Sequence, residues 1–203
     1  MSTSSGRIID AAGDVTISMP VPPDANLPAT QKQLGVKRSK TQEDLKVRFK
    51  VSAGSLSSAS SYFKGRLGSS WPEGKELLEK GTVELEIPEF DVDAVFIILS
   101  IIHGRTREVP AAINLEEFYR LAVVTDYFQC PEAIAFFAKI WARPHWNFPN
   151  TLTSELKKWI SISHIFGLQE TLQKAIDIAA YHGEGPFDTE NMPIPHFIQS
   201  ESA

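Results

Sequence analysis

The sequence has little cysteine and no long apolar run. Among its 203 residues, only Cys130 is a cysteine, which excludes an intrachain disulfide framework and a cysteine-based zinc site. The longest apolar stretch, residues 94–102, is interrupted by Ser100 and is far shorter than the roughly 20 residues of a membrane-spanning helix. Residues 1–13 lack the apolar run of a signal peptide. We therefore expect an intracellular protein, cytoplasmic or nuclear, without a membrane partner.

Positive charge is scarce as well. The formal net charge is −5 and the pI is about 5.6. The only basic cluster is Lys37-Arg38-Ser39-Lys40, which is more typical of a solvated loop than of a nuclear-import signal. A chain without a basic field has little to hold a phosphate backbone, so we do not expect nucleic acid as a partner.

Patterns that carry catalysis or bind cofactors are also missing. No two of the five histidines have the i, i+4 spacing of metal ligands on a helix, no glycine-rich loop follows a strand, and there is no Gly-x-Ser-x-Gly sequence. Cys130 precedes a predicted helix, which could lower its pKa, but a small structural residue is the preferred interpretation. Glu116, Glu117 and Asp126 are more typical of a solvated helix surface than of an acid–base pair. We therefore expect that the protein is not an enzyme and binds no cofactor or metal. An enzyme whose active site is assembled from residues distant in sequence stays open as an alternative.

What the sequence does contain is strand-like alternation at three places. Apolar residues alternate with polar ones over residues 14–19, 45–51 and 83–87, which predicts three half-buried strands. Residues 52–67 predict two short helical turns and residues 68–80 an irregular segment. Residues 20–43 hold four prolines and predict a long loop inserted between the first two strands.

From Asp91 the apolar period becomes that of a helix. Asp91 is a predicted N-cap for a helix that is apolar nearly all round and ends at Gly104, and Asn114 with Glu117 predicts a capping box. Further helices are predicted over residues 131–141, 154–166 and 168–182, the last two as an antiparallel hairpin. The predicted fold class is α+β, a small sheet capped by a helical cluster. The predicted parts are a disordered N-terminus (1–7), a main domain (8–141), a C-terminal helical hairpin (150–183) and a loose tail (184–203).

The order of these elements resembles a known family. The run from Val47 to Leu67, with Leu56 and Ser60-Ser61-Tyr62-Phe63, resembles the strand–helix–helix core of a BTB/POZ domain. The strand at 83–87 and the helix ending in Ile101-Ile102-His103-Gly104 follow in the family's order, as does the helix over residues 121–128. Residues 9–15 and 109–141 resemble the divergent fungal-type members, so the likeness covers residues 8–141. The insertion at 20–43 departs from the family, as does Ser52-Ala53-Gly54 at the usual histidine-containing start of the first helix.

The resemblance implies self-association or recruitment of protein partners, and many family members are substrate adaptors of cullin-based ubiquitin ligases. Cullin recruiters carry a hydrophobic-x-Glu element at a set distance after the second helix's Phe, where this chain has Trp71-Pro72-Glu73. The resemblance places Ile97 near that surface, and His103 stands where the family has Tyr. The plainer interpretation is that Trp71 packs on its own domain, Glu73 is solvated and Ile97 belongs to the core. A BTB scaffold or transcription cofactor without a ligase role stays open as the alternative.

Two structural expectations follow. The side chains of Phe63, Leu85, Phe96 and Leu99 are predicted to be buried. The family's dimers pair through the first helix and first strand, and we expect residues 15–19 to form an edge strand that supports a weak homodimer, because an apolar edge exposes unpaired backbone groups.

Overall fold

The computed structural model describes residues 6–21, 46–143 and 148–182. Within these ranges the chain forms a mixed sheet of four strands in the order β1-β3-β2-β4. The strands are β1 (Gly6–Ile8), β2 (Val15–Pro20), β3 (Lys46–Val51) and β4 (Val83–Glu86). β2 runs antiparallel to β3 and parallel to β4, and β1 runs parallel to β3. The predicted α+β class is confirmed, and so are the three strands found by alternation.

The alternation of each strand places its apolar residues on one face of the sheet. Ile17 is the cross-strand neighbour of both Phe49 and Leu85, and all three side chains are fully buried. Cross-strand contacts of this kind are the unit of stability in a sheet. The opposite face is polar, and Arg48 of β3 reaches over β2 to Glu84 of β4 at 3.2 Å.

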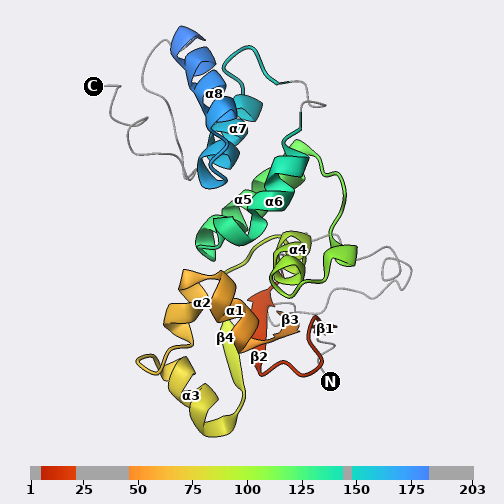
Figure 1. Ribbon diagram of the computed structural model, residues 1–203, viewed down its shortest axis with the longest axis vertical. Coiled ribbons are helices and arrows are strands. Elements are labelled where there is room, and N and C mark those ends of the chain that lie inside the picture. The colour runs from red at the N-terminus through yellow and green to blue at the C-terminus, as the bar shows by residue number, and fades with distance from the viewer. Residues whose placement is uncertain (1–5, 22–45, 144–147, 183–203) are drawn as a thin grey trace, which may run out of the picture.

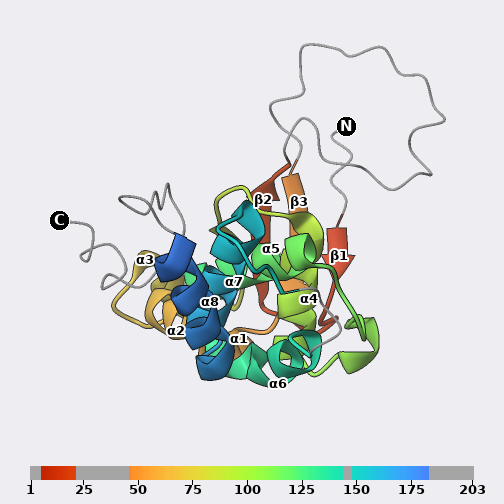
Figure 2. The same ribbon diagram turned by 90° about the horizontal axis from the view of Figure 1, so that it is seen from above.

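The helices gather on the apolar face of the sheet and extend away from it (Figures 1 and 2). They are α1 (Ala53–Ala59), α2 (Ser61–Arg66), α3 (Pro72–Lys80), α4 (Val92–Ile102), the short 3-10 helix η3 (Thr106–Glu108), α5 (Leu115–Tyr127), α6 (Pro131–Trp141), α7 (Ser154–Ile165) and α8 (Gln169–His182). In the described parts of the chain, no helix is both long and apolar enough to span a bilayer.

The helix starts are set by the predicted caps. The Asp91 carboxylate accepts hydrogen bonds from the backbone N–H groups of Asp93 and Ala94. Asn114 and Glu117 form the reciprocal bonds of a capping box at the start of α5. Such caps satisfy N–H groups that have no partner inside the helix. Both predictions are confirmed.

The C-terminal hairpin has a small core of its own and also joins the main one. Its own cluster is Leu156, Ile160, Leu172, Ala175 and Ala179. Trp159 of α7 and Phe166, the C-cap residue of that helix, face α5, and their ring centroids lie 6.3 Å and 5.4 Å from that of Phe118. The hairpin of α7 and α8 is therefore packed on the helical cluster by aromatic contacts.

Several expectations are corrected. Gly6 and Arg7, predicted in the disordered N-terminus, lie in β1, which is too short to show a period and is held by its pairing with β3. The segment 68–80, predicted as irregular, contains α3, whose one buried residue is Gly74. The residues expected at an edge, Val15–Met19, lie inside the sheet between β3 and β4. The prediction of a loop over residues 20–43 falls, beyond Pro20 and Val21, outside the described residues, as does the tail 184–203.

The expected burial is confirmed for Phe63, Leu85 and Leu99, which are all fully buried. Phe96 is only half-buried, because it faces β1 at the rim of the sheet, where the Arg7 guanidinium lies 4.9 Å from its ring centroid. Arg7 also pairs with Asp93 at 3.1 Å. The helical period correctly predicted that Phe96 lies on the side of α4 that faces the sheet. The predicted full burial of its side chain was wrong.

The difference in burial between Phe63 and Phe96 predicts different losses of stability when each is replaced by alanine. Phe63→Ala is expected to lower the free energy of unfolding by about 3–5 kcal/mol, because it opens a cavity in the core. Phe96→Ala is expected to lower it by about 1–2 kcal/mol, because half of its surface already meets water. Urea unfolding of both variants and the wild type measures the difference. Equal losses would contradict the rim position of Phe96.

Candidate protein-interaction site

Trp71 is held at the start of α3 with its side chain turned to solvent. It is the N-cap residue in an extended conformation, with Pro72 in the first helical turn, a position that suits proline because its missing N–H is not needed there. The Trp71 side chain is 54% exposed, and Leu78 further along the helix is 74% exposed. Large exposed aromatic residues are the usual anchors of protein interfaces. Figure 1 shows α3 at one end of the molecule, away from α7 and α8.

Close backbone packing fixes this helix start. A Cβ atom on Gly74 would lie 2.0 Å from the carbonyl oxygen of Gly68, so no larger residue fits without a backbone shift. The backbone N–H of Trp71 also donates to the Gly68 carbonyl at 3.0 Å. The exposed tryptophan therefore sits on a rigid support.

Glu73, predicted as the second partner-binding residue, turns inward. Its carboxylate accepts hydrogen bonds from Arg66 Nε at 3.0 Å and pairs with Nη2 at 2.9 Å, and both side chains are less than a quarter exposed. The pKa of Glu73 is lowered, mainly by its own backbone N–H and then by Arg66, while partial burial acts in the opposite direction. The carboxylate is thus ionised and already bonded within the chain.

Arg66 links this pair to the rest of the molecule. Its Nη1 donates to Tyr62 Oη at 2.7 Å and to the Glu86 carbonyl at 2.9 Å. Tyr62 Oη lies 3.2 Å from Tyr127 Oη of α5. Burial, followed by the contact with Tyr62, raises the pKa of Tyr127 to about 12. This chain of polar contacts connects the start of α3 with α5.

The other two predicted residues lie elsewhere. Ile97 is half-buried and lines a cavity of about 140 Å³ between α4, residues 110–113 and α5. His103 Nδ1 donates to the Leu99 carbonyl at 2.7 Å, and its Nε2 accepts from the Ser52 N–H at 3.0 Å. These two bonds together require the neutral imidazole with its proton on Nδ1. His103 therefore ties the end of α4 to the start of α1, and the four predicted residues form no single patch.

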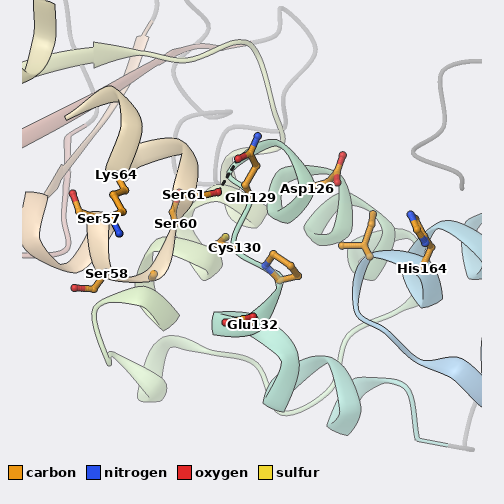
Figure 3. Close-up of a pocket in the computed structure, with 13 residues that line it drawn as sticks. Ser57, Ser58, Ser60, Ser61, Lys64, Asp126, Gln129, Cys130, Glu132 and His164 are labelled. Atoms are coloured by element: carbon orange, nitrogen blue, oxygen red, sulfur yellow. Dashed lines mark hydrogen bonds between the residues drawn. The ribbon is translucent and has the colours of Figure 1, made fainter. Parts of the chain in front are cut away.

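The structure reveals a second hollow that the sequence did not point to. A groove of about 620 Å³ lies between α1–α2, the turn from α5 to α6, and the end of α7 (Figure 3). Its lining residues are Ser57, Ser58, Ala59, Ser60, Ser61, Lys64, Asp126, Gln129, Cys130, Pro131, Glu132, His164 and Ile165. They come from three distant stretches of sequence, so no local motif marks them. The sequence had suggested possible chemistry only for Asp126 and Cys130 among them, each on its own and not as parts of one groove.

Two neighbouring residues that line this groove depart from the usual backbone conformation or pKa of their residue type. Gln129 has φ 50°, in the left-handed region, which costs a residue with a Cβ about 1–2 kcal/mol. Cys130 is buried, and burial raises the pKa of its thiol to about 12. The possibility of a lowered pKa at Cys130 is therefore wrong, because loss of solvent outweighs the effect of the helix start.

Comparisons with known proteins add no assignment. No family model matches the sequence, and no curated protein matches it either. Across the described ranges, no group of three or more His, Cys, Asp or Glu side chains is placed to hold a metal ion.

The pair of Glu73 and Arg66 predicts a pH-dependent contribution to stability. A carboxyl group whose pKa is lower in the folded state stabilises the fold above its unfolded pKa, here about 4.5, and this contribution disappears as the pH falls through the folded pKa. Glu73→Gln is expected to lower the unfolding free energy by about 1–3 kcal/mol at pH 7, with the difference from wild type shrinking below about pH 4.5.

Urea unfolding at several pH values measures this difference. Glu76→Gln is the matched control, because Glu76 pairs with Lys80 on the same helix in solvent, where such pairs contribute little to stability. A Glu73→Gln loss that stays constant down to pH 3 would indicate a packing effect instead of a charge effect.

Proposed function

We propose that this chain is a non-catalytic protein–protein interaction module of the BTB/POZ type, which recruits partners through the surface around Trp71. The observation that carries the proposal is the exposed Trp71 side chain on a rigid support, at the place where the resemblance expects a partner-binding residue. The order of elements adds support. Strand β3 leads into a pair of serine-capped short helices, and β4 and the apolar helix α4 follow, in the order that the resemblance implies, with α3 as an addition between α2 and β4.

Recruitment of a cullin is the specific form of this proposal. Trp71→Ala is expected to reduce the amount of purified cullin retained by the immobilised chain at least tenfold, because truncating a central aromatic anchor typically costs about 2 kcal/mol or more. Phe136→Ala is the control, since Phe136 is a similarly exposed aromatic residue, at 68%, on another helix.

Each outcome of the pull-down is informative. Retention by the wild type and by Phe136→Ala, but not by Trp71→Ala, supports the ligase-adaptor role. Undiminished retention by Trp71→Ala would reject Trp71 as the anchor. No retention by the wild type would reject the cullin.

A BTB-type scaffold or transcription cofactor without a ligase role is the second candidate. The inward position of Glu73 favours it, because that carboxylate is bonded to Arg66 and is not turned to a partner. His103, which replaces the family's Tyr, is likewise bonded within the chain on both ring nitrogens.

Self-association is the remaining part of the proposal. Because Val15–Met19 lies in an interior strand, we now propose β1 as the strand through which two copies pair. β1 is the edge of the sheet beside β3, and Ile8 at its end is 63% exposed. An edge strand offers unpaired backbone groups to a second copy, but three residues offer few bonds. We expect a weak, concentration-dependent dimer.

Sedimentation across a concentration series measures this association. Deleting residues 1–8 is expected to remove it, and Ile8→Lys to weaken it, while neither change reaches the interior strand β2. A dimer that persists at nanomolar concentration, or that survives the deletion, would contradict the edge-strand contact.

A further inference from the structure

The groove at the turn from α5 to α6 is a separate surface from that of Trp71. One wall is built by α1 and α2, the other by the end of α7, and the turn with Gln129 lies between them (Figure 3). Trp71 and the other residues of the α3 start do not line it. The mouth is open to solvent and its lining mixes hydroxyl, carboxamide and charged groups with the apolar surface of Ala59, Pro131 and Ile165.

Gln129 is the first sign that the groove has a role. Three helices end with the same pair of backbone hydrogen bonds, closing α4 at Gly104, α5 at Gln129 and α7 at Gly167, with φ values of 69°, 50° and 63°. Glycine is the usual residue at this left-handed position because it has no Cβ. Among the described residues, Gln129 is the one non-glycine residue with a positive φ, and it lines the groove.

The Gln129 carboxamide is held ready for a further contact. Its Oε1 accepts a hydrogen bond from the Ser61 hydroxyl at 2.7 Å, which fixes the orientation of the amide. Nε2 has no hydrogen-bond partner among the described residues, and a carboxamide oxygen accepts more than one bond. An oriented carboxamide with a free donor and a free lone pair matches the N–H and C=O groups of an extended peptide.

Two carboxylates supply the second feature. Asp126 and Glu132 flank Gln129 in the groove, and neither has an ion pair or side-chain hydrogen bond within the parts of the chain that are described. Asp126 lies in the last turn of α5, where the helix dipole disfavours a negative charge. By contrast, Glu116 at the other end of α5 is bonded to Lys158 and Arg120.

We propose that this groove binds an extended peptide segment of a partner protein that carries a lysine or arginine. A cationic side chain of the peptide pairs with Asp126 or with Glu132, and the peptide backbone bonds to the Gln129 carboxamide. A polyanion is disfavoured by the same two carboxylates, which face one lysine, Lys64, across the groove. The inference takes from the proposed function only that the chain recruits protein partners, and it uses none of the Trp71 surface.

The test starts from a phage-displayed library of random 12-residue peptides selected on the full-length chain. Peptides that are enriched over selection on an unrelated protein are labelled, and their affinities are measured by fluorescence anisotropy at low salt. We expect the enriched peptides to share a lysine or arginine. Asp126→Asn with Glu132→Gln is expected to weaken their binding at least tenfold. The matched control is Glu155→Gln with Glu170→Gln, which makes the same change in charge on the exposed starts of α7 and α8.

Gln129→Gly separates binding from folding. Glycine relieves the left-handed strain, so the melting temperature is expected to rise by a few degrees while peptide affinity falls several-fold. A groove residue with a merely structural role would not give this opposite pair of effects. The inference is overturned if no peptide is enriched, if the enriched peptides lack a basic residue, if the groove double variant binds like its control, or if Gln129→Gly binds like the wild type.

Trp71→Ala distinguishes the two proposals. Peptide binding that survives Trp71→Ala places the peptide away from α3 and supports the groove. Loss of peptide binding in Trp71→Ala would overturn the groove inference and leave the proposed function standing. Failure of the cullin pull-down does not affect the peptide measurement.

Discussion

The Ser60 hydroxyl is the contact on which both candidate surfaces depend. It accepts a hydrogen bond from the Phe63 N–H, which starts α2, and donates to the Phe128 carbonyl at the end of α5. Ser60 is 2% exposed, so neither bond has water as a substitute, and leaving such a buried group unpaired costs about 1–3 kcal/mol. Beside it the Phe63 and Phe128 rings pack with centroids 4.8 Å apart. This junction sets the position of α2, which carries Arg66 toward α3 on one side and Ser61 toward the groove on the other.

The two surfaces differ in how their polar groups are used. At the start of α3 the Glu73 carboxylate is bonded internally to Arg66, which also bonds Tyr62, and the apolar ring of Trp71 is exposed beside them. In the groove the reverse holds, because hydroxyl, amide and carboxylate groups line the hollow. The first surface suits an apolar contact with a folded partner, and the second suits an extended, charged segment.

Periodicity was sufficient for most of the fold. The alternation over β2, β3 and β4 and the helical period from Asp91 onward reflect local contact with a core, so they are visible along the sequence. Helix α3 was missed because it buries only Gly74 and therefore shows no apolar stripe. The strand β1 and the interior place of β2 depend on pairings between residues distant in sequence, and periodicity carries no information about which strands are neighbours. The exposure of Phe96 likewise depends on how far β1 reaches over α4.

The candidate site was predicted only in part. The resemblance pointed to Trp71, and the side chain is exposed as a docking role requires. The inward turn of Glu73 depends on Arg66, seven residues earlier and on another helix, and the two hydrogen bonds of His103 depend on the spatial meeting of α4 with α1. The groove brings together residues 57–64, 126–132 and 164–165, a combination that only the folded chain creates.

The interior position of β2 has a consequence for folding during synthesis. Val15–Pro20 is synthesised before one of its two sheet neighbours, β4, which lies more than sixty residues later in the chain. Until Val83–Glu86 leaves the ribosome, one edge of β2 has no native partner and its apolar face lacks the helices that cover it. Non-local pairings of this kind slow folding and expose unpaired strands to association. The nascent chain therefore passes through a stage in which the apolar strand β2 has an unpaired edge and can associate with other chains.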